Sequence, residues 1–113
     1  MRFSFWPDPV QPYADVLALA QHAERTGWDG FWYADHFMPD DHEPSGPCTE
    51  AWVTLSAIGA QVPRLQLGTL VSGNTYRHPA VLAKMAATLD HITGGRGTLG
   101  LGSGWQENEH RQY

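Results

Sequence analysis

Apolar positions follow two alternating spacings along the chain. Short apolar runs at residues 2–6, 30–34, 65–71 and 98–101 are typical of buried strands. The stretches between the runs carry apolar residues three or four positions apart, which predicts helices starting at Tyr13, Glu50 and Pro79. Gly27 and Gly94 are the expected ends of the first and third helices, because glycine tolerates the backbone of a helix end. The pattern therefore predicts strands that alternate with helices.

The spacing of the predicted strands indicates the fold class. Their centres lie about 30 residues apart, which is the length of a repeated βα unit. Strands joined by helices run parallel, and such units close into a (β/α)8 TIM-type barrel or form an open doubly wound α/β sheet. A complete barrel needs about 250 residues. We therefore expect the 113 residues to form only about four βα units, the N-terminal half of a single barrel domain over residues 1–113.

The composition of the chain argues against two classes of binding partner, nucleic acids and membranes. Seven Lys and Arg residues against twelve Asp and Glu residues give a net charge of -5, which argues against nucleic acid as a partner. No apolar run approaches the roughly 20 residues that cross a bilayer, so we expect no membrane partner. The single cysteine, Cys48, cannot form an internal disulfide, and this favours a cytoplasmic location.

The run GFWYADHF ends a predicted strand in a titratable pair, Asp35 and His36. In both architectures the loops after the strands carry the active site, so this pair is the first candidate for chemistry. The imidazole of His36 can donate or accept a proton near neutral pH if a carboxylate or backbone partner fixes its tautomer. The alternative is a histidine that only stabilises its loop through local hydrogen bonds.

The loop that follows has a composition that could also ligate a metal. Its candidate ligands are Asp35, His36, Asp40, Asp41, His42, Glu43 and Cys48. The spacing does not match a structural zinc site, whose ligand pairs lie two to four residues apart, and we expect no metal. A metal-dependent hydrolase remains the alternative enzyme class. We also expect the polar segment from Asp40 to Pro47 to be mobile, because it has little to bury.

Two further strand ends carry polar or glycine-rich segments. Arg77 and His78, in SGNTYRHPA, could bind an anion, although such residues more often cap a helix or pair with carboxylates. The segment LGLGSGWQENEH resembles a dinucleotide motif, but Trp105 stands where its third glycine would be. Its glycines permit either close approach of backbone amides to a flat or anionic ligand or a tight strand-to-helix turn.

Three segments in order, ADHF, LGTLVSGNTYRHPAVLA and LGLGSGWQENEH, resemble the luciferase-like monooxygenase family, and within it the deazaflavin-dependent branch. The resemblance covers essentially the whole chain. It implies a (β/α) barrel oxidoreductase that binds the deazaflavin coenzyme F-420, or alternatively FMN, and transfers hydride at its central ring to or from a small-molecule substrate.

The resemblance also assigns residues. His36 matches the residue that handles a proton beside the cofactor ring, and Leu70–Val71 matches a non-prolyl cis peptide behind that ring. The implied cofactor contacts are Asp35, Leu70, Val71, Ser72, Asn74, Ser103, Gly104 and Asn108. One position departs from the pattern: deazaflavin-dependent sugar-phosphate dehydrogenases have a catalytic glutamate where this chain has Trp105. That departure argues against a sugar phosphate as the substrate.

Half a barrel lacks the loops after the seventh and eighth strands, which commonly bind a ligand phosphate. We therefore expect residues 1–113 to be inactive alone. The open edges of the sheet also make a homo-oligomer the expected state, and a non-catalytic, self-associating half barrel is a further alternative.

Overall fold

The computed structural model describes residues 1–40 and 45–113. Its elements in chain order are β1 (Ser4–Phe5), α1 (Tyr13–Arg25), β2 (Gly30–Asp35), α2 (Ala51–Gly59), β3 (Gln66–Gly73), α3 (Pro79–Thr93), β4 (Gly97–Thr98), β5 (Leu101–Gly102) and α4 (Glu107–Gln112). The predicted alternation of strands and helices is confirmed, and the three expected helices start within one residue of their predicted positions.

Local signals in the sequence account for the helix ends. The side chain of Glu50 caps α2 by accepting a 2.7 Å hydrogen bond from the amide of Val53. His78 caps α3 in the same way, and Pro79 follows at the first helical position. Gly94 ends α3 in the left-handed conformation, with φ of 66°, where a Cβ would be unfavourable.

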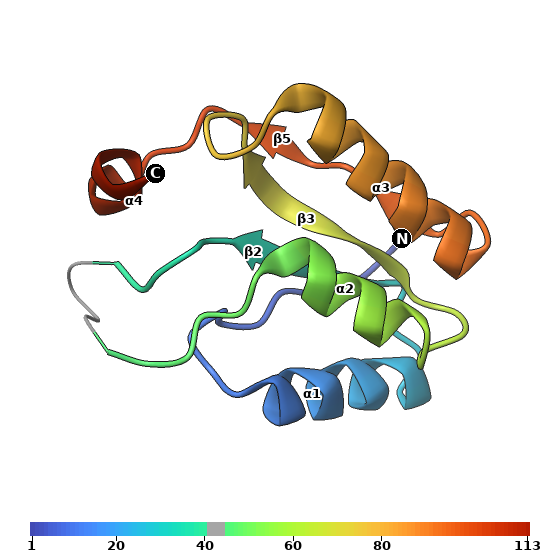
Figure 1. Cartoon of the computed structure of the whole chain (residues 1–113). Coiled ribbons are helices and arrows are strands. Elements are labelled where there is room, and N and C mark those ends of the chain that lie inside the picture. Colours follow the sequence, from blue (N-terminus) through green and yellow to red (C-terminus); the bar gives the residue numbers. More distant parts are fainter. Residues whose placement is uncertain (41–44) are drawn as a thin grey trace.

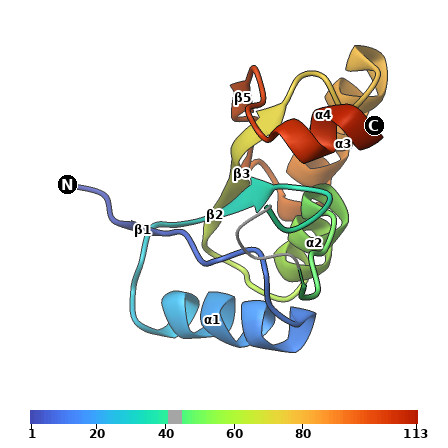
Figure 2. The same cartoon turned by 90° about the vertical axis from the view of Figure 1, so that its left-hand side faces the viewer.

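All strands are parallel, in the order β1-β2-β3-β4, and β5 also pairs with β3. Figures 1 and 2 show α1, α2 and α3 together on one side of the sheet. The main hydrophobic core fills the space between the sheet and these helices. Its largest buried members are Phe31, Tyr33, Trp52, Leu55, Ile58, Leu65, Leu67 and Leu89. This core fixes the strands, so that their carboxyl ends meet at one edge.

The other side of the sheet carries no helix of the described chain (Figure 2). Phe5 lies on the helix side, where its ring meets Trp28 at 5.8 Å between centroids. Trp32 lies on the open side, against Gly68, where an added Cβ would come within 2.8 Å of the indole. The open side is the one that a closed barrel would enclose.

The fourth predicted strand, residues 98–101, is wrong as a single element. The structure divides it into β4 and β5, with Leu99 and Gly100 between them. The reason lies in β3, which has one more residue between Thr69 and Ser72 than its neighbours, a β-bulge. The carbonyl of Gly100 accepts hydrogen bonds from the amide of Ser72 and the hydroxyl of Thr69, both at 2.9 Å.

The predicted mobility of residues 40–47 stays a prediction, because residues 41–44 lie outside the described part of the chain. The same holds for Asp41, His42 and Glu43 as metal ligands. Within residues 1–40 and 45–113, no three His, Cys, Asp or Glu side chains come together as a possible metal site. None of the described helices is long and apolar enough to cross a membrane.

Candidate active site

A cavity of about 390 Å³ lies at the carboxyl ends of the strands. Its walls come from the last residues of β2, β3 and β5 and from residues that follow β1, β2, β3 and β5. The lining residues are Trp6, Ala34, Asp35, His36, Leu70, Val71, Gly73, Tyr76, Gly102, Ser103, Gly104 and Trp105. Six of the nine residues assigned from the sequence are therefore brought together here: Asp35, His36, Leu70, Val71, Ser103 and Gly104.

His36 is placed at this cavity by the end of β2. Its side chain is 21% exposed, and its Nδ1 lies 3.0 Å from Oε2 of Glu109. The edge of its ring meets Trp105, with centroids 5.7 Å apart. No hydrogen bond from any described residue reaches the other ring nitrogen, Nε2. Within residues 1–40 and 45–113, the protein therefore bonds one nitrogen of the imidazole and not the other.

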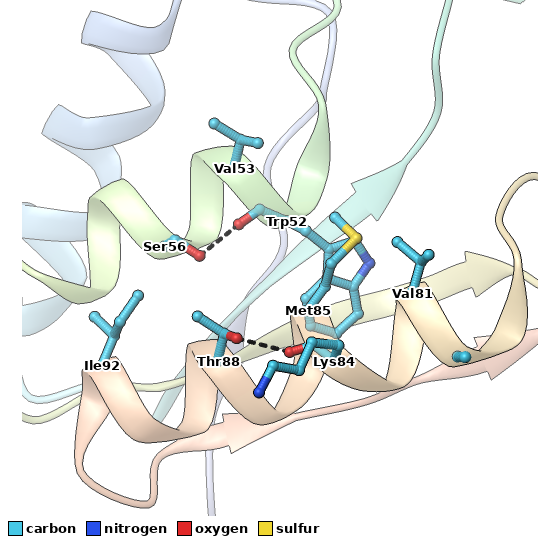
Figure 3. A pocket seen from close by; sticks show the side chains of 9 residues that line it. Trp52, Val53, Ser56, Val81, Lys84, Met85, Thr88 and Ile92 are labelled. Atoms are coloured by element: carbon cyan, nitrogen blue, oxygen red, sulfur yellow. Dashed lines mark hydrogen bonds between the residues drawn. The ribbon is translucent and has the colours of Figure 1, made fainter.

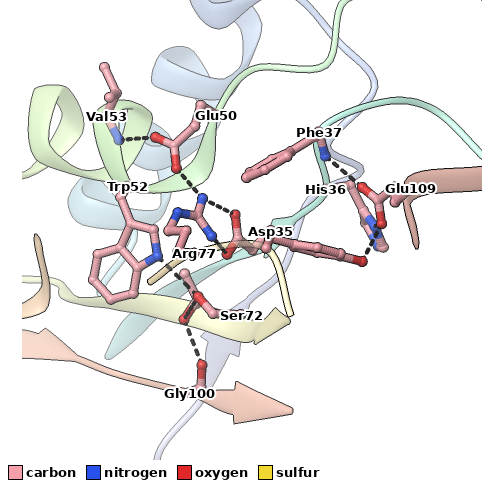
Figure 4. A network of polar contacts seen from close by, with 12 residues as sticks. Asp35, His36, Phe37, Glu50, Trp52, Val53, Ser72, Arg77, Gly100 and Glu109 are labelled. Carbon is pink, nitrogen blue, oxygen red and sulfur yellow. Dashed lines mark hydrogen bonds and ion pairs between the residues drawn. The ribbon is translucent and has the colours of Figure 1, made fainter. Parts of the chain in front are cut away.

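Glu109 comes from α4 and is fully buried. Its Oε1 accepts a 2.6 Å hydrogen bond from the amide of Phe37, and its Oε2 also accepts a 2.5 Å bond from the hydroxyl of Tyr76. Figure 4 shows this carboxylate between His36 and Phe37. Burial, and then the hydrogen bond to Glu109, raise the pKa of Tyr76, so its hydroxyl stays protonated and donates.

Asp35, the neighbour of His36, belongs to a separate network (Figure 4). Its buried carboxylate pairs with Arg77 through two hydrogen bonds of 2.5 and 2.7 Å. The same guanidinium bonds Glu50, and burial opposes the charge of Arg77 while the two carboxylates raise its pKa. Arg77 was expected either to bind an anion or to pair with carboxylates, and the pairing is confirmed. The expected capping role is confirmed for His78.

The bulge of β3 forms the apolar wall of the cavity. The peptide bond between Leu70 and Val71 is cis, as the resemblance implies. The two side chains are 48% and 42% exposed. Ser72 instead is fully buried: its hydroxyl accepts a 3.0 Å bond from the indole of Trp52 and donates to Thr69. Ser72 therefore holds the bulge from behind and does not line the cavity.

The turn between β5 and α4 forms the opposite rim. Gly104 has φ of 79°, and an added Cβ would come within 3.0 Å of the ring of His110. Trp105, the next residue, is 69% exposed. Asn108 lies away from the cavity, where its amide donates a 3.1 Å bond to the carbonyl of Pro39. Asn74 is exposed and is bound through its backbone to Gly102.

Sequence reasoning missed Glu109 and Tyr76 as members of the site. Both fall within the quoted segments, but nothing in those segments marks Glu109 as buried. The six residues of α4, ENEHRQ, are all polar, and only Glu109 among them is buried. Its partner His36 lies 73 positions earlier, so only the tertiary fold brings the two together.

A larger hollow of about 660 Å³ lies between α2 and α3, on the outer surface (Figure 3). Its exposed side chains are mostly apolar, including Val53, Val81 and Ile92. The hydroxyl of Ser56 donates to the carbonyl of Trp52 within the helix. Among the described residues that line this groove, Lys84 is the one with a titratable side chain, so the groove offers little chemistry. The strand-end cavity is therefore the candidate active site.

The curated proteins that are similar in sequence include F420-dependent glucose-6-phosphate dehydrogenases. An F420-dependent glucose-6-phosphate dehydrogenase of Amycolatopsis mediterranei is 40% identical over 97 residues, covering 84% of this chain and 28% of that protein. The enzyme of the same name from Kineococcus radiotolerans is 43% identical over 96 residues, covering 80% of this chain and 27% of that protein. The chain therefore spans less than a third of the length of these relatives.

Solved structures share the fold. A monooxygenase from Streptomyces bottropensis matches with a TM-score of 0.86 and 26% identity, over 99% of this chain and 36% of that one. An F420-dependent secondary alcohol dehydrogenase, solved with an F420-acetone adduct, matches with a TM-score of 0.82 and 28% identity, over 91% of this chain and 32% of that one. The predicted α/β class, the first part of a (β/α)8 barrel, is confirmed. The sequence also matches luciferase-like monooxygenases over residues 1–113, and the chain therefore belongs to that family.

Proposed function

We propose that residues 1–113 form the first part of a single barrel domain in an oxidoreductase that depends on coenzyme F-420, with FMN as the alternative. The observation that carries the proposal is the position of His36, whose Nε2 is bonded by no described residue and whose ring lies beside the apolar wall of Leu70 and Val71. Relatives named for F420 dependence support the choice of cofactor. Bound there, the deazaflavin or flavin would supply hydride transfer at its central ring.

The residues present fit a flat ring. Leu70 and Val71 offer exposed apolar side chains toward the cavity. Gly73 and Gly102 keep it open, because a Cβ at either position would come within 2.6 Å of Tyr76 or Val71. We propose that Leu70 and Val71 contact the face of the ring, and that Ser103 and Gly104 contact its edge. Ser72 and Asp35 support this wall from the protein side. Asn74 and Asn108 remain proposed contacts of the cofactor outside the cavity.

We propose that His36 donates or accepts the proton that accompanies hydride transfer, through Nε2. A general acid or base contributes about 10²- to 10⁴-fold to turnover. In the complete enzyme, His36→Ala should lower turnover by at least about tenfold and leave the dissociation constant of the cofactor within a few-fold. Stopped-flow turnover and fluorescence titration of the cofactor measure the two quantities.

Three other outcomes would count against this role. Unchanged turnover would make His36 a loop-stabilising residue. Collapse of cofactor binding would make it a structural support of the pocket. Stoichiometric zinc or manganese that disappears in His36→Ala would instead favour the alternative, a metal-dependent hydrolase. His91→Ala is the matched control, because this histidine is exposed on α3 and lies outside the cavity lining.

The substrate we propose is a small molecule with an apolar portion near Trp105. The named activity of the curated relatives concerns glucose-6-phosphate. The exposed indole of Trp105 borders the cavity beside His36 and argues against the same substrate for this chain. Among the described residues, no lysine or arginine lines this cavity to meet a phosphate.

We also propose that the protein works in the cytoplasm, which its single unpaired Cys48 favours.

We further propose that the chain self-associates. Open edges at β1 and at β4 and β5 support self-association, as do Val53 and Val81, 68% and 52% exposed at the outer groove. Sedimentation at several concentrations should show a species heavier than 12.5 kDa. If Val81→Lys dissociates the oligomer, the groove between α2 and α3 is the contact surface. If the oligomer persists, the contact is at the edges of the sheet. A monomer at every concentration contradicts the proposal.

A further inference from the structure

The carboxylate of Glu109 is surrounded by hydrogen-bond donors from other segments of the chain. Its carboxylate is fully buried and accepts from the amide of Phe37, the ring of His36 and the hydroxyl of Tyr76. These donors come from the loop after β2 and the segment after β3. A buried carboxylate is costly unless its oxygens are bonded, so the three donors and the acid require one another.

The arrangement decides which nitrogen of His36 carries a proton. A carboxylate accepts hydrogen bonds and has no hydrogen to give, so the nitrogen that faces it must be the donor. We propose that Glu109 is a positioning residue that holds His36 in the tautomer protonated at Nδ1, which leaves Nε2 as the atom that exchanges a proton with the substrate. The catalytic meaning of this inference depends on the function proposed above, but the tautomer itself does not.

Tyr76 and Phe37 make the position of Glu109 unambiguous. The amide of Phe37 can only donate, and it fixes Oε1 at 2.6 Å. Oε2 is thereby directed at both His36 and Tyr76. Trp105 contacts the ring of His36 at its edge and restricts rotation. The imidazole thus has a fixed plane and a fixed protonated nitrogen, and its Nε2 is not bonded by any residue in the described part of the chain.

Glu109→Gln tests the inference because an amide has unequal ends. The amide of Phe37 cannot accept, so the oxygen of the glutamine should stay on it and the NH2 group should turn toward His36. That NH2 group donates, so Nδ1 must now accept and the proton must move to Nε2. In the Ser-His-Asp triad, the corresponding aspartate-to-asparagine change lowers turnover about 10⁴-fold, because it holds the wrong tautomer.

The direct measurement is the 15N spectrum of the imidazole nitrogens of the 113-residue chain, recorded at a pH where the ring is neutral. His36 is assigned from the resonance that is lost in His36→Gln. The wild-type chain should show a protonated Nδ1, and Glu109→Gln should show a protonated Nε2. Glu107→Gln, on the exposed side of the same helix, and Tyr76→Phe, which leaves the Glu109–His36 contact in place, should both retain the wild-type tautomer.

A wild-type chain protonated at Nε2 overturns the inference without any variant, so poor folding of Glu109→Gln does not weaken the test. A folded Glu109→Gln protein that keeps the proton on Nδ1 overturns it as well. In the complete enzyme, Glu109→Gln should lower kcat by at least about tenfold with little change in KM. Because the spectrum needs no cofactor, failure of the redox function and failure of the tautomer assignment are read separately.

Discussion

Asp35 and His36 are neighbours in the sequence, yet they enter two different buried networks (Figure 4). Asp35 joins Arg77 and Glu50, where both carboxylates meet one guanidinium that is only 8% exposed. His36 joins Glu109 and Tyr76 and retains a side chain that is 21% exposed. The Asp35–Arg77 pair is buried and both oxygens of Asp35 are bonded, so we call the first network closed, although Glu50 at its margin is 33% exposed. In the second network no described residue bonds Nε2 of His36, and we call this network open.

The difference indicates which residue of the pair is free for chemistry. In the closed network both oxygens of Asp35 are bonded to Arg77, so a ligand would have to break an ion pair to reach them. In the open network the described residues bond Nδ1 of His36 and none of them bonds Nε2. Adjacent titratable residues can therefore have separate tasks: Asp35 fixes the end of β2 to the segments before α2 and α3, and His36 faces the cavity.

The largest effect should follow from opening the closed network. Arg77→Met keeps the apolar stem but leaves Asp35 buried without its cation, which should lower the free energy of unfolding by about 3–5 kcal/mol. The matching change in the open network, Tyr76→Phe, removes one hydroxyl donor from a buried carboxylate and should cost about 1.5–3 kcal/mol. Urea unfolding of the 113-residue chain, followed by tryptophan fluorescence, gives both values.

Arg111→Met is the control for loss of an arginine charge, because its pair with Glu107 is exposed and should contribute at most about 1 kcal/mol. If Arg77→Met costs no more than Tyr76→Phe, the Asp35 network is not the structural one and the comparison fails.

The sequence allowed the ion pair of the closed network to be predicted, but it did not indicate that Glu109 belongs to the open network. Arg77 stands just before a helix whose cap and first-turn proline are visible in the sequence, and pairing with carboxylates was one of its two interpretations. Periodicity likewise located the first three helices and the carboxyl ends of β2 and β3 to within two residues. Glu109 lies in a short polar helix without an apolar stripe, so no local pattern indicates that it is buried. The division of the last strand also escaped prediction, because its cause is an extra residue in the neighbouring strand β3.

Cys48 lies close to both networks, and the charges of Glu109 and Asp35 influence the pKa of its thiol. Its Sγ contacts the carbonyl of His36 at 3.4 Å. Burial raises its pKa to about 11, with smaller contributions from the charges of Glu109, Asp35 and Asp8, in that order. An ordinary thiol has a pKa of 9.0, so the folded chain holds this proton more tightly than the unfolded chain. Its contribution to stability is therefore complete below about pH 9 and declines as the pH rises through 11.

The smallest effect we predict is a few-fold change in the reactivity of this thiol when Glu109 is replaced. Because the thiolate is the nucleophile, iodoacetamide should modify Cys48 at pH 8 roughly a hundredfold more slowly in the folded chain than in urea. Glu109→Gln removes a charge and should lower the pKa of Cys48, so labelling should be a few-fold faster than in the wild type and in Glu107→Gln. Asp35→Asn should have less effect, since Arg77 already offsets the charge of Asp35. Equal labelling rates in Glu109→Gln and the wild type would contradict this prediction. They would mean that burial sets the pKa of Cys48 and that the charge of Glu109 has no measurable effect on it. Mass spectrometry of timed samples, with circular dichroism to check that each variant is folded, distinguishes these cases.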